Sequence, residues 1–229
     1  EAETVGSGSP GRNSGFVLEH AFTAANTAAA SVLYKLYQAT QNEIRATAYQ
    51  GAQTPKSHIF KGAATQRGEK NLAGLAQFLE KSGQPFEWMD SDHMRSITGS
   101  SYYRAGLNLP GNSLVNPYAL ISNLARSLQP SITLYEESPA IHLSQDYLGD
   151  WLIATPEGSL KAPMVFLANN AFAASLGVGN AYSVKIFTYA GVTPQLPADL
   201  FASLAPEGHW GLLPAHRLGS TLRTTEDGR

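Results

Sequence analysis

The sequence predicts an α/β fold with mixed sheets and two interwoven domains. Along its 229 residues, segments with apolar residues at helical spacing alternate with short apolar runs that are typical of strands. The intervals between these segments are too irregular for a simple parallel repeat of strand and helix. The sequence also contains no internal repeat and no low-complexity tract.

Helices and strands alternate in the first half of the chain. Phe22, Ala29 and Leu33 belong to an apolar stripe at helical spacing. Thr65 is a favoured helix N-cap, and Gly83 is a typical residue after a helix. In chain order we expect a helix over about 23–48, a strand beginning at 58–60, a helix from Thr65 to Gly83, a strand over 86–89, a short helix capped by Asp90 or Ser91 and ending near Ile97, and a strand over 103–109.

The second half begins with Asn116-Pro117, an N-cap followed by proline at the first helical position. The helix that follows carries an apolar stripe over 120–128, which we expect to be buried, and Pro130 ends it. Pro156-Glu157-Gly158 predicts a turn between two strands. The strands expected in this half cover 132–135, 151–154, 164–168, 182–189, 210–213 and 218–223.

Composition and charge argue against several classes of function. The formal net charge of −2 gives no basic footprint for nucleic acid. There is no run of 18 apolar residues that would span a membrane, and no signal-peptide pattern. The absence of cysteine excludes disulfides and a thiolate nucleophile, and it fits a reducing compartment. We therefore predict a cytoplasmic protein.

Hydrolytic and metal sites find no support in the sequence. None of the six histidines pairs with another at the helical spacing of zinc ligands, and no cysteine could complete such a site. No G-x-S-x-G nucleophile elbow occurs. We predict that the protein holds no metal.

A glycine-rich loop near the start is the main candidate site. Residues 6–11, GSGSPG, match the dinucleotide pattern G-x-G-x-x-G. That pattern joins a buried strand to a helix, whereas only five residues precede it here, and Pro10 removes a backbone donor. The chemistry nevertheless suits a nucleotide, because Glu1 can accept from ribose hydroxyls, glycine-rich backbone can face an anion, and Arg12 adds a charge-assisted bond. Composition alone favours a flexible terminal loop instead.

Both ends of the sequence suggest a piece of a longer protein. The chain starts with Glu1 rather than methionine. Near the other end, Asp227-Gly228 is a strong hairpin signal, but no returning strand follows it. We expect an internal fragment.

Five segments, taken in order, resemble one known family. EA at 1–2 followed by GSGSPGRNSG at 6–15 is similar to the E-A and G-x-G-A-S-G-R-N-G-G stretch of the D-amino-acid-oxidase-like FAD-dependent oxidoreductases, in particular the γ-glutamylputrescine oxidase-like branch. Pro10 and Ser14 depart from that pattern. The other four similar segments are RAGLNLPGNSLVNPYALISNLARSL at 104–128, ESPAIHL at 137–143, MVFLANNAF at 164–172 and STLRTTEDGR at 220–229.

The resemblance implies a partial FAD-binding Rossmann-like domain, formed by 1–54 and 112–178. It is interwoven with a mixed-sheet substrate-binding domain, formed by 55–111 and 179–229. In this family the true dinucleotide fingerprint lies one βα unit earlier, so the resemblance also implies that residues 1–229 alone do not hold FAD. The residues that it places on FAD are Glu1, Ser9, Gly11, Arg12, Asn13, Gly15, Phe16, Ala140, Ala168, Asn169 and Asn170.

The implied function is oxidation of a C–N bond in a small-molecule amine or amino acid, with hydride transfer to FAD and hydrolysis of the imine. The resemblance names no catalytic residue. It implies noncovalent FAD, because cysteine is absent and His20 matches no attachment position. Arg223 resembles an arginine that holds the substrate carboxylate in some relatives, although an exposed arginine beside a turn is the plainer interpretation. Two alternatives stay open: the tRNA-modifying branch of the same fold, which would prefer a basic surface, and an inert fragment.

Overall fold

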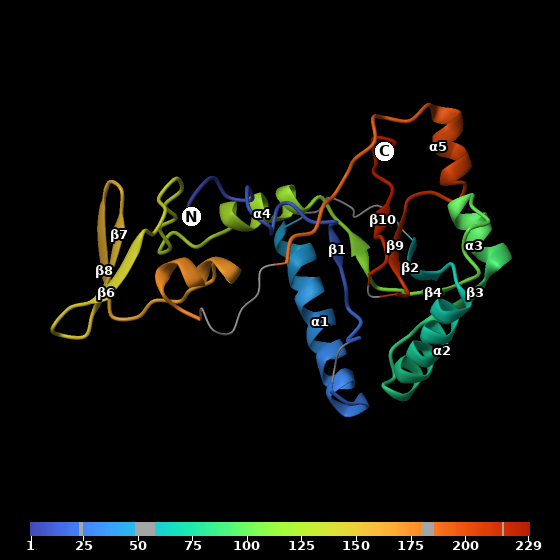
Figure 1. Ribbon diagram of the computed structural model, residues 1–229, viewed down its shortest axis with the longest axis horizontal. Coiled ribbons are helices and arrows are strands. Elements are labelled where there is room, and N and C mark those ends of the chain that lie inside the picture. The colour runs from blue at the N-terminus through green and yellow to red at the C-terminus, as the bar shows by residue number, and fades with distance from the viewer. Residues whose placement is uncertain (23–24, 49–57, 180–185, 217) are drawn as a thin grey trace.

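The structure is a computed structural model that describes residues 1–22, 25–48, 58–179, 186–216 and 218–229 (Figure 1). Its elements confirm the predicted mixture of helices and mixed sheets. In chain order they are β1 (Phe16–Val17), α1 (Thr27–Ala48), β2 (His58–Ala63), α2 (Gln66–Lys81), β3 (Glu87–Asp90), α3 (Ser91–Thr98), β4 (Ala105–Asn108), β5 (Ser113–Leu114), α4 (Pro117–Arg126), β6 (His142–Gln145), β7 (Trp151–Thr155), β8 (Gly158–Ala162), the 3₁₀ helix η1 (Asn170–Leu176), α5 (Ala198–Leu204), β9 (Trp210–Pro214) and β10 (Leu222–Arg223).

A five-stranded mixed sheet organises one part of the molecule. Its order is β10-β9-β2-β4-β3, and β2 is parallel to β9 while the other neighbours are antiparallel. All five strands come from the two ranges predicted for the substrate-binding domain. The sheet with α2, α3 and α5 is called the sheet half below. The division of the whole chain into two domains stays a prediction.

Both faces of this sheet are covered by apolar side chains. On one face, Phe60 of β2 packs with Leu212 of β9 and with residues of α3. On the opposite face, Leu107 of β4 packs with Leu72 and Leu79 of α2. Because successive strand residues point to opposite faces, neighbouring residues of one strand serve the two cores.

The predicted helix caps are confirmed in three places. In each case the side chain of the N-cap residue accepts a hydrogen bond from the backbone amide three residues further on. The pairs are Thr65 with Gly68, Asp90 with His93, and Asn116 with Ala119. These bonds satisfy amide groups that the first turn of a helix leaves without an intrahelical partner. The first helix begins at Thr27 rather than near 23, and the Asn26 side chain accepts from the Ala29 amide at that start.

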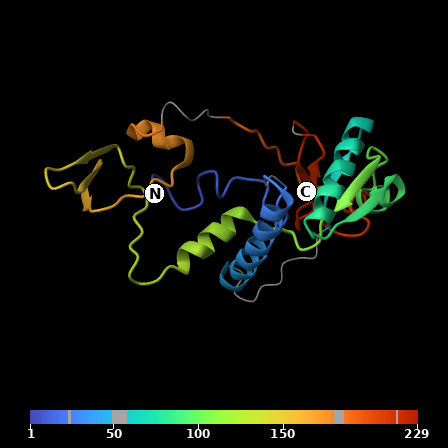
Figure 2. The same cartoon turned by 90° about the horizontal axis from the view of Figure 1, so that it is seen from below.

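A second part, called the outer half, consists of residues 116–179. It contains α4, the antiparallel sheet β6-β7-β8 and η1, and Figures 1 and 2 show it extending away from the sheet half. None of its residues is buried. The expected burial of the apolar stripe of α4 was therefore wrong, and Leu128 at its end is exposed.

Several predicted strands are also absent from the described residues. Segments 132–135, 164–168 and 186–189 form no strand, and residues 182–185 of the last prediction lie outside the described residues. The physical reason is that a strand needs a neighbour to accept its backbone hydrogen bonds. No described segment pairs with these three as a strand.

Among the described residues, no helix is long and apolar enough to cross a membrane.

Candidate cofactor and substrate site

The glycine-rich loop folds into successive turns. Main-chain bonds run from the Ser7 amide to the Thr4 carbonyl (3.1 Å), from the Gly11 amide to the Gly8 carbonyl (3.0 Å), and from the Arg12 amide to the Ser9 carbonyl (3.2 Å). Gly6 adopts a φ of 84°, which favours glycine. A side chain at Gly11 would collide with the Gly6 carbonyl, because the loop turns back on itself there. The loop therefore has a defined turn structure that its own backbone hydrogen bonds hold.

Asn13 holds this loop from within. Its amide nitrogen donates to the Ser9 and Pro10 carbonyls at 3.2 and 2.7 Å, and its side-chain oxygen accepts from the Gly15 amide at 2.8 Å. Ser9 and Arg12 are exposed, and within the described part of the chain their side chains make no hydrogen bond or ion pair. The Ser9 hydroxyl and the Arg12 guanidinium are therefore exposed on the glycine-rich loop, where they could donate hydrogen bonds to a ligand.

Arg223 joins the loop to the sheet half. Its Nη1 donates to the Ser14 carbonyl at 2.9 Å and to the Val115 carbonyl at 2.8 Å. Gly15 has a φ of 72°, and a side chain there would collide with both Val115 and the Arg223 guanidinium. The half-buried guanidinium therefore locks the end of the loop against β5 and β10. Its contact with a substrate carboxylate stays a prediction.

The loop exit lies directly on the five-stranded sheet. Phe16 of β1 pairs with Leu114 of β5. A Cβ placed on Gly211 of β9 would lie 2.7 Å from the Phe16 ring and 2.9 Å from the Leu114 side chain. The short β1–β5 ribbon thus covers one face of β9.

The first residues lie beside the segment that enters β6. The Glu1 amino group donates to the Tyr135 carbonyl, and the Glu1 carbonyl accepts from the Ser138 amide, both at 2.9 Å. Ala140, predicted to lie near an adenine, is exposed two residues further on. Figures 1 and 2 both show the N-terminal end on the side of the outer half. The backbone of the first residues is therefore held against the segment that enters β6.

The segment before η1 carries two unusual features. Within the described residues, the side-chain oxygen of Asn169 is buried and has no hydrogen-bond partner. The next residue, Asn170, has a φ of 51°, and Glu137 beside the first residues has a φ of 52°. Among the described residues these are the two non-glycine positions with positive φ. Backbone in this region is strained, and such strain clusters at ligand sites. Ala168, also predicted on the cofactor face, is exposed.

Sequence reasoning missed a buried polar cluster after β1. His20 is buried, with Nε2 2.7 Å from the Pro85 carbonyl and Nδ1 3.3 Å from the Asn112 side-chain oxygen, which also accepts from the Glu19 amide. The His20 ring lies 13° from parallel to that of Phe22, with centroids 5.7 Å apart. Burial, followed by the Glu19 carboxylate, raises the pKa of Tyr34 above its usual value.

Lys61 adjoins this cluster on the central strand β2. Its ammonium lies 4.8 Å from the centroid of the Phe22 ring, and burial lowers the pKa of the lysine. The sequence signal was available, because a lysine interrupts the apolar pattern of the strand HIFKGA.

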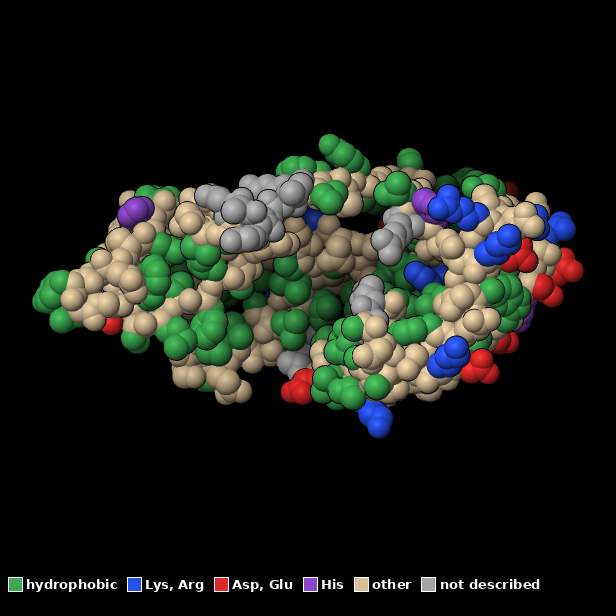
Figure 3. Space-filling view, turned by 60° about the horizontal axis from the view of Figure 1, so that its bottom comes forward, with side chains coloured by type: hydrophobic (Ala, Val, Ile, Leu, Met, Phe, Trp, Pro, Cys, Tyr) green, Lys and Arg blue, Asp and Glu red, His purple; other side chains and the backbone are tan. Residues whose placement is uncertain are grey.

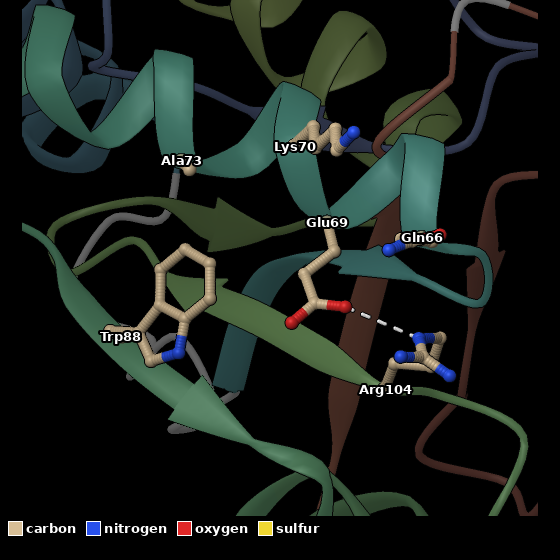
Figure 4. A pocket seen from close by; sticks show the side chains of 6 residues that line it. All are labelled: Gln66, Glu69, Lys70, Ala73, Trp88 and Arg104. Carbon is tan, nitrogen blue, oxygen red and sulfur yellow. Dashed lines mark hydrogen bonds and ion pairs between the residues drawn. The ribbon is translucent and has the colours of Figure 1, made fainter.

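Two surface hollows lie away from the loop. One, of about 410 Å³, lies between α2 and the edge strand β3, where Glu69 and Arg104 form an ion pair at 3.2 Å (Figure 4). Its lining residues are Gln66, Glu69, Lys70, Ala73, Trp88 and Arg104. The second, of about 640 Å³, is lined by Arg67, Asn71, Ala215, His216 and Leu218. None of the predicted cofactor residues lines either hollow.

The chain is an α/β protein with a glycine-rich loop that carries the exposed Arg12 guanidinium and Ser9 hydroxyl, groups that suit an anion such as a phosphate. The family comparison is more specific. The model of the family described as "DAO: FAD dependent oxidoreductase" matches residues 1–229. The chain belongs to this family of FAD-dependent oxidoreductases, which confirms the predicted family and FAD as the cofactor.

Solved structures of similar fold support the same architecture. Glycine oxidase from Geobacillus kaustophilus is 17% identical with a TM-score of 0.75, and the match covers 100% of this chain and 61% of that chain. L-alpha-glycerophosphate oxidase from Mycoplasma pneumoniae with FAD bound is 14% identical with a TM-score of 0.64, over 97% of this chain and 60% of that chain. L-amino acid deaminase from Proteus myxofaciens in complex with anthranilate is 15% identical with a TM-score of 0.66, and the match covers 100% of this chain and 50% of that chain.

These likenesses concern the fold, and the chain spans between half and about three fifths of the length of these three structures. Among curated proteins, none matches the sequence.

Three of the residues predicted to bind FAD have chemistry that suits it. FAD carries two phosphates and several hydroxyl groups, which require donors and acceptors respectively. Arg12 and Ser9 are donors without protein partners among the described residues, and the buried Asn169 oxygen is an acceptor without one. An orphaned buried acceptor costs about 1–3 kcal/mol unless a ligand satisfies it. The branch of the family and the fragment expectation stay predictions.

Proposed function

We propose that the protein oxidises the C–N bond of an amine or amino acid. The single observation that carries the proposal is the match of the FAD-dependent oxidoreductase family to all 229 residues. When bound, FAD would supply the two-electron acceptor for a hydride from the carbon next to nitrogen, and the resulting imine would hydrolyse in water. The residues of this chain contribute by binding, orienting and enclosing the reactants.

The proposed cofactor residues divide by chemistry. Glu1 would accept from the ribose hydroxyls, and Ser9 and Arg12 would donate to the phosphates. Gly11 and Gly15 would allow close backbone approach, and Asn13 would hold the loop in shape. The remaining proposed contacts are Phe16, Ala140, Ala168, Asn169 and Asn170.

We propose that FAD is held noncovalently. The chain has no cysteine, and both ring nitrogens of His20 face acceptors within the protein. Extraction with trichloroacetic acid should therefore release the yellow cofactor into the supernatant. Flavin retained by the precipitated protein would contradict this expectation.

The proposed substrate is a small amino acid or amine, not a nucleic acid. The glycine oxidase and L-amino acid deaminase of similar fold carry amino-acid chemistry in their names. The net charge of −2 gives no basic surface for RNA, and with the absence of cysteine we propose a cytoplasmic protein. Arg223 stays a candidate for the substrate carboxylate, with its Nη1 already bound to two carbonyls.

The test uses the FAD-loaded protein. Its visible flavin absorption should bleach anaerobically with some members of a panel of amino acids and amines, and peroxide release in air would then identify an oxidase. No bleaching with any member, together with bleaching by a modified uridine in RNA, would replace the proposal with the tRNA-modifying alternative.

A further inference from the structure

The segment that leaves the glycine-rich loop, residues 17–21, is called the exit segment. β1 ends at Val17, and within the described part of the chain no strand pairs with residues 18–21. Residues 19–21 are nevertheless buried. Buried backbone groups need hydrogen-bond partners, because an unpaired one costs about as much as a lost hydrogen bond. The exit segment therefore depends on side chains for these bonds.

Three side-chain amides supply partners to alternate residues of the exit segment. They come from α1, from the turn between β4 and β5, and from the residues that follow α2. The first donates to the backbone, and the other two accept from it. The pairs are Gln41 Nε2 with the Val17 carbonyl (3.0 Å), Asn112 Oδ1 with the Glu19 amide (2.7 Å) and Gln84 Oε1 with the Ala21 amide (2.8 Å).

The two glutamines are each bound at both ends of the amide group. The Oε1 of Gln41 also accepts from the Ser113 hydroxyl at 3.3 Å, so this residue contacts both strands of the β1–β5 ribbon. The Nε2 of Gln84 donates to the Ser82 hydroxyl at 2.8 Å. Both glutamine residues are 2% exposed. Because the two ends of an amide differ in donor and acceptor, Gln41 acts on the exit segment as a donor and Gln84 as an acceptor.

These bonds place the loop, whereas its own bonds give it its shape. The main-chain bonds within residues 4–12 and the bonds of Asn13 are internal, so they do not fix the loop relative to the sheet half. The exit segment begins two residues after Gly15 and is bonded to α1 and to the end of α2. Binding groups that are held in place before a ligand arrives lose less entropy when it binds.

We propose that Gln41 and Gln84 are positioning residues for FAD. They hold the exit segment so that Ser9 and Arg12 have the arrangement that the phosphates need, and they act through the loop without contacting the cofactor. The inference rests on the proposed cofactor contacts of the loop, and it adds two residues that no pattern in the sequence indicated.

The experiment measures FAD affinity and loop exchange in variants of the full chain. Gln41→Met and Gln84→Met remove the hydrogen-bonding atoms and keep the length of the side chain. The Kd for FAD, measured by flavin fluorescence, should rise about 10-fold or more in each variant. In the FAD-free protein, the amides of residues 6–15 should exchange faster than in the wild type.

Thr98→Val is the matched control for lost stability. Thr98 is 1% exposed, and its hydroxyl donates to the Met94 carbonyl within α3 at 2.8 Å. The variant should therefore lower the unfolding temperature but leave the Kd for FAD and the exchange of residues 6–15 unchanged. A rise in Kd as large as that in the two Met variants would reduce Gln41 and Gln84 to ordinary stabilising residues and overturn the proposal.

A pair of variants with the same new charge tests the direction of the two bonds. Gln84→Glu keeps an oxygen toward the Ala21 amide, whereas Gln41→Glu places an oxygen against the Val17 carbonyl. The two positions are equally buried, so the cost of the charge is common to both. The Kd for FAD should stay within about threefold of the wild-type value in Gln84→Glu and rise about 10-fold or more in Gln41→Glu. Equal Kd values in the two variants would overturn the proposal.

Hydrogen exchange with and without FAD separates this proposal from the cofactor contacts on which it rests. Bound FAD should slow exchange at residues 6–15 of the wild-type protein. If it does not, the proposed contacts of the loop fail, and the positioning role fails with them. If FAD slows exchange there but both Met variants bind it as tightly as the wild type, the contacts stand and only the positioning role of Gln41 and Gln84 fails.

Discussion

The two halves of the molecule contrast in how they use their apolar residues. In the sheet half, α2, α3 and α5 cover both faces of the five-stranded sheet, and residues such as Phe60 and Leu107 are fully buried. In the outer half, Met164 is 65% exposed and Phe166 is 85% exposed. Figure 3 shows the charged side chains of one face gathered mainly over the sheet half, with a hollow between the halves. A run of apolar residues in the sequence thus forms a core only where another helix or strand packs against it.

The largest expected difference between the halves is in hydrogen exchange. Amides of β2 and β4 are bonded within a covered sheet, whereas 164–168 have no strand partner among the described residues. Amides of the sheet should be protected by about 10³-fold or more relative to those of 164–168. Exchange followed by NMR or mass spectrometry provides the measurement. Equal protection of the two segments would mean that 164–168 pairs with a strand in solution.

Matched truncations should sharpen the contrast. Leu107→Ala in the core should lower the free energy of unfolding by about 2–5 kcal/mol. Phe166→Ser in the outer half should change it by no more than about 0.5 kcal/mol. Urea unfolding of both variants, with circular dichroism as the probe, checks the pair. A large loss in Phe166→Ser would show that this side chain is covered in the folded protein.

The connection between the halves can be broken at Gly15. Alanine there must adopt a positive φ and displace the Arg223 guanidinium, which should destabilise the protein by about 1–3 kcal/mol. FAD affinity, measured by flavin fluorescence, should fall as well, because the loop loses its anchor. Gly74→Ala, at an exposed position of α2 where added bulk meets nothing within 4 Å, is the control. Unchanged affinity in Gly15→Ala would separate the loop from the cofactor.

The smallest effect concerns the outer sheet, where the exposed Lys161 forms ion pairs with the partly buried Asp146 and Asp150. A hydrogen bond from Lys161 holds the pKa of Asp146 below its usual range, at an Nζ to oxygen distance of 2.6 Å. A lowered folded-state pKa means that the stabilisation is present above about pH 4, the unfolded value, and is lost as pH falls through the folded pKa. The NMR signals of β6–β8 should therefore change as the pH falls through the folded pKa of Asp146. Asp146→Asn should abolish this change. The same acid transition in Asp146→Asn would assign it to another group.

Local signals made the helix starts predictable in both halves. Thr65, Asp90 and Asn116 act within three residues of their own positions, so a sequence reader can place the helix starts. Segment 164–168 illustrates the opposite case, since an apolar run indicates a strand but not whether a partner is present. The bonds from Arg223 to Ser14 and Val115 could not be predicted, because they depend on how distant segments pack. The family resemblance supplied the roles expected of the loop residues. The surroundings of Lys61, in contrast, follow only from the pairing register of β2 with its neighbouring strands.

The order of synthesis gives the Arg223 contact a further consequence. Ser14 and Arg223 are 209 residues apart, and the loop comes first. At about 5–20 residues per second, on the order of 10–40 s pass between the emergence of the two partners. During that interval the loop has none of the bonds from Arg223, so a nascent chain cannot hold it in its final shape. Any cofactor that requires the locked loop must therefore be captured after β10 has left the ribosome.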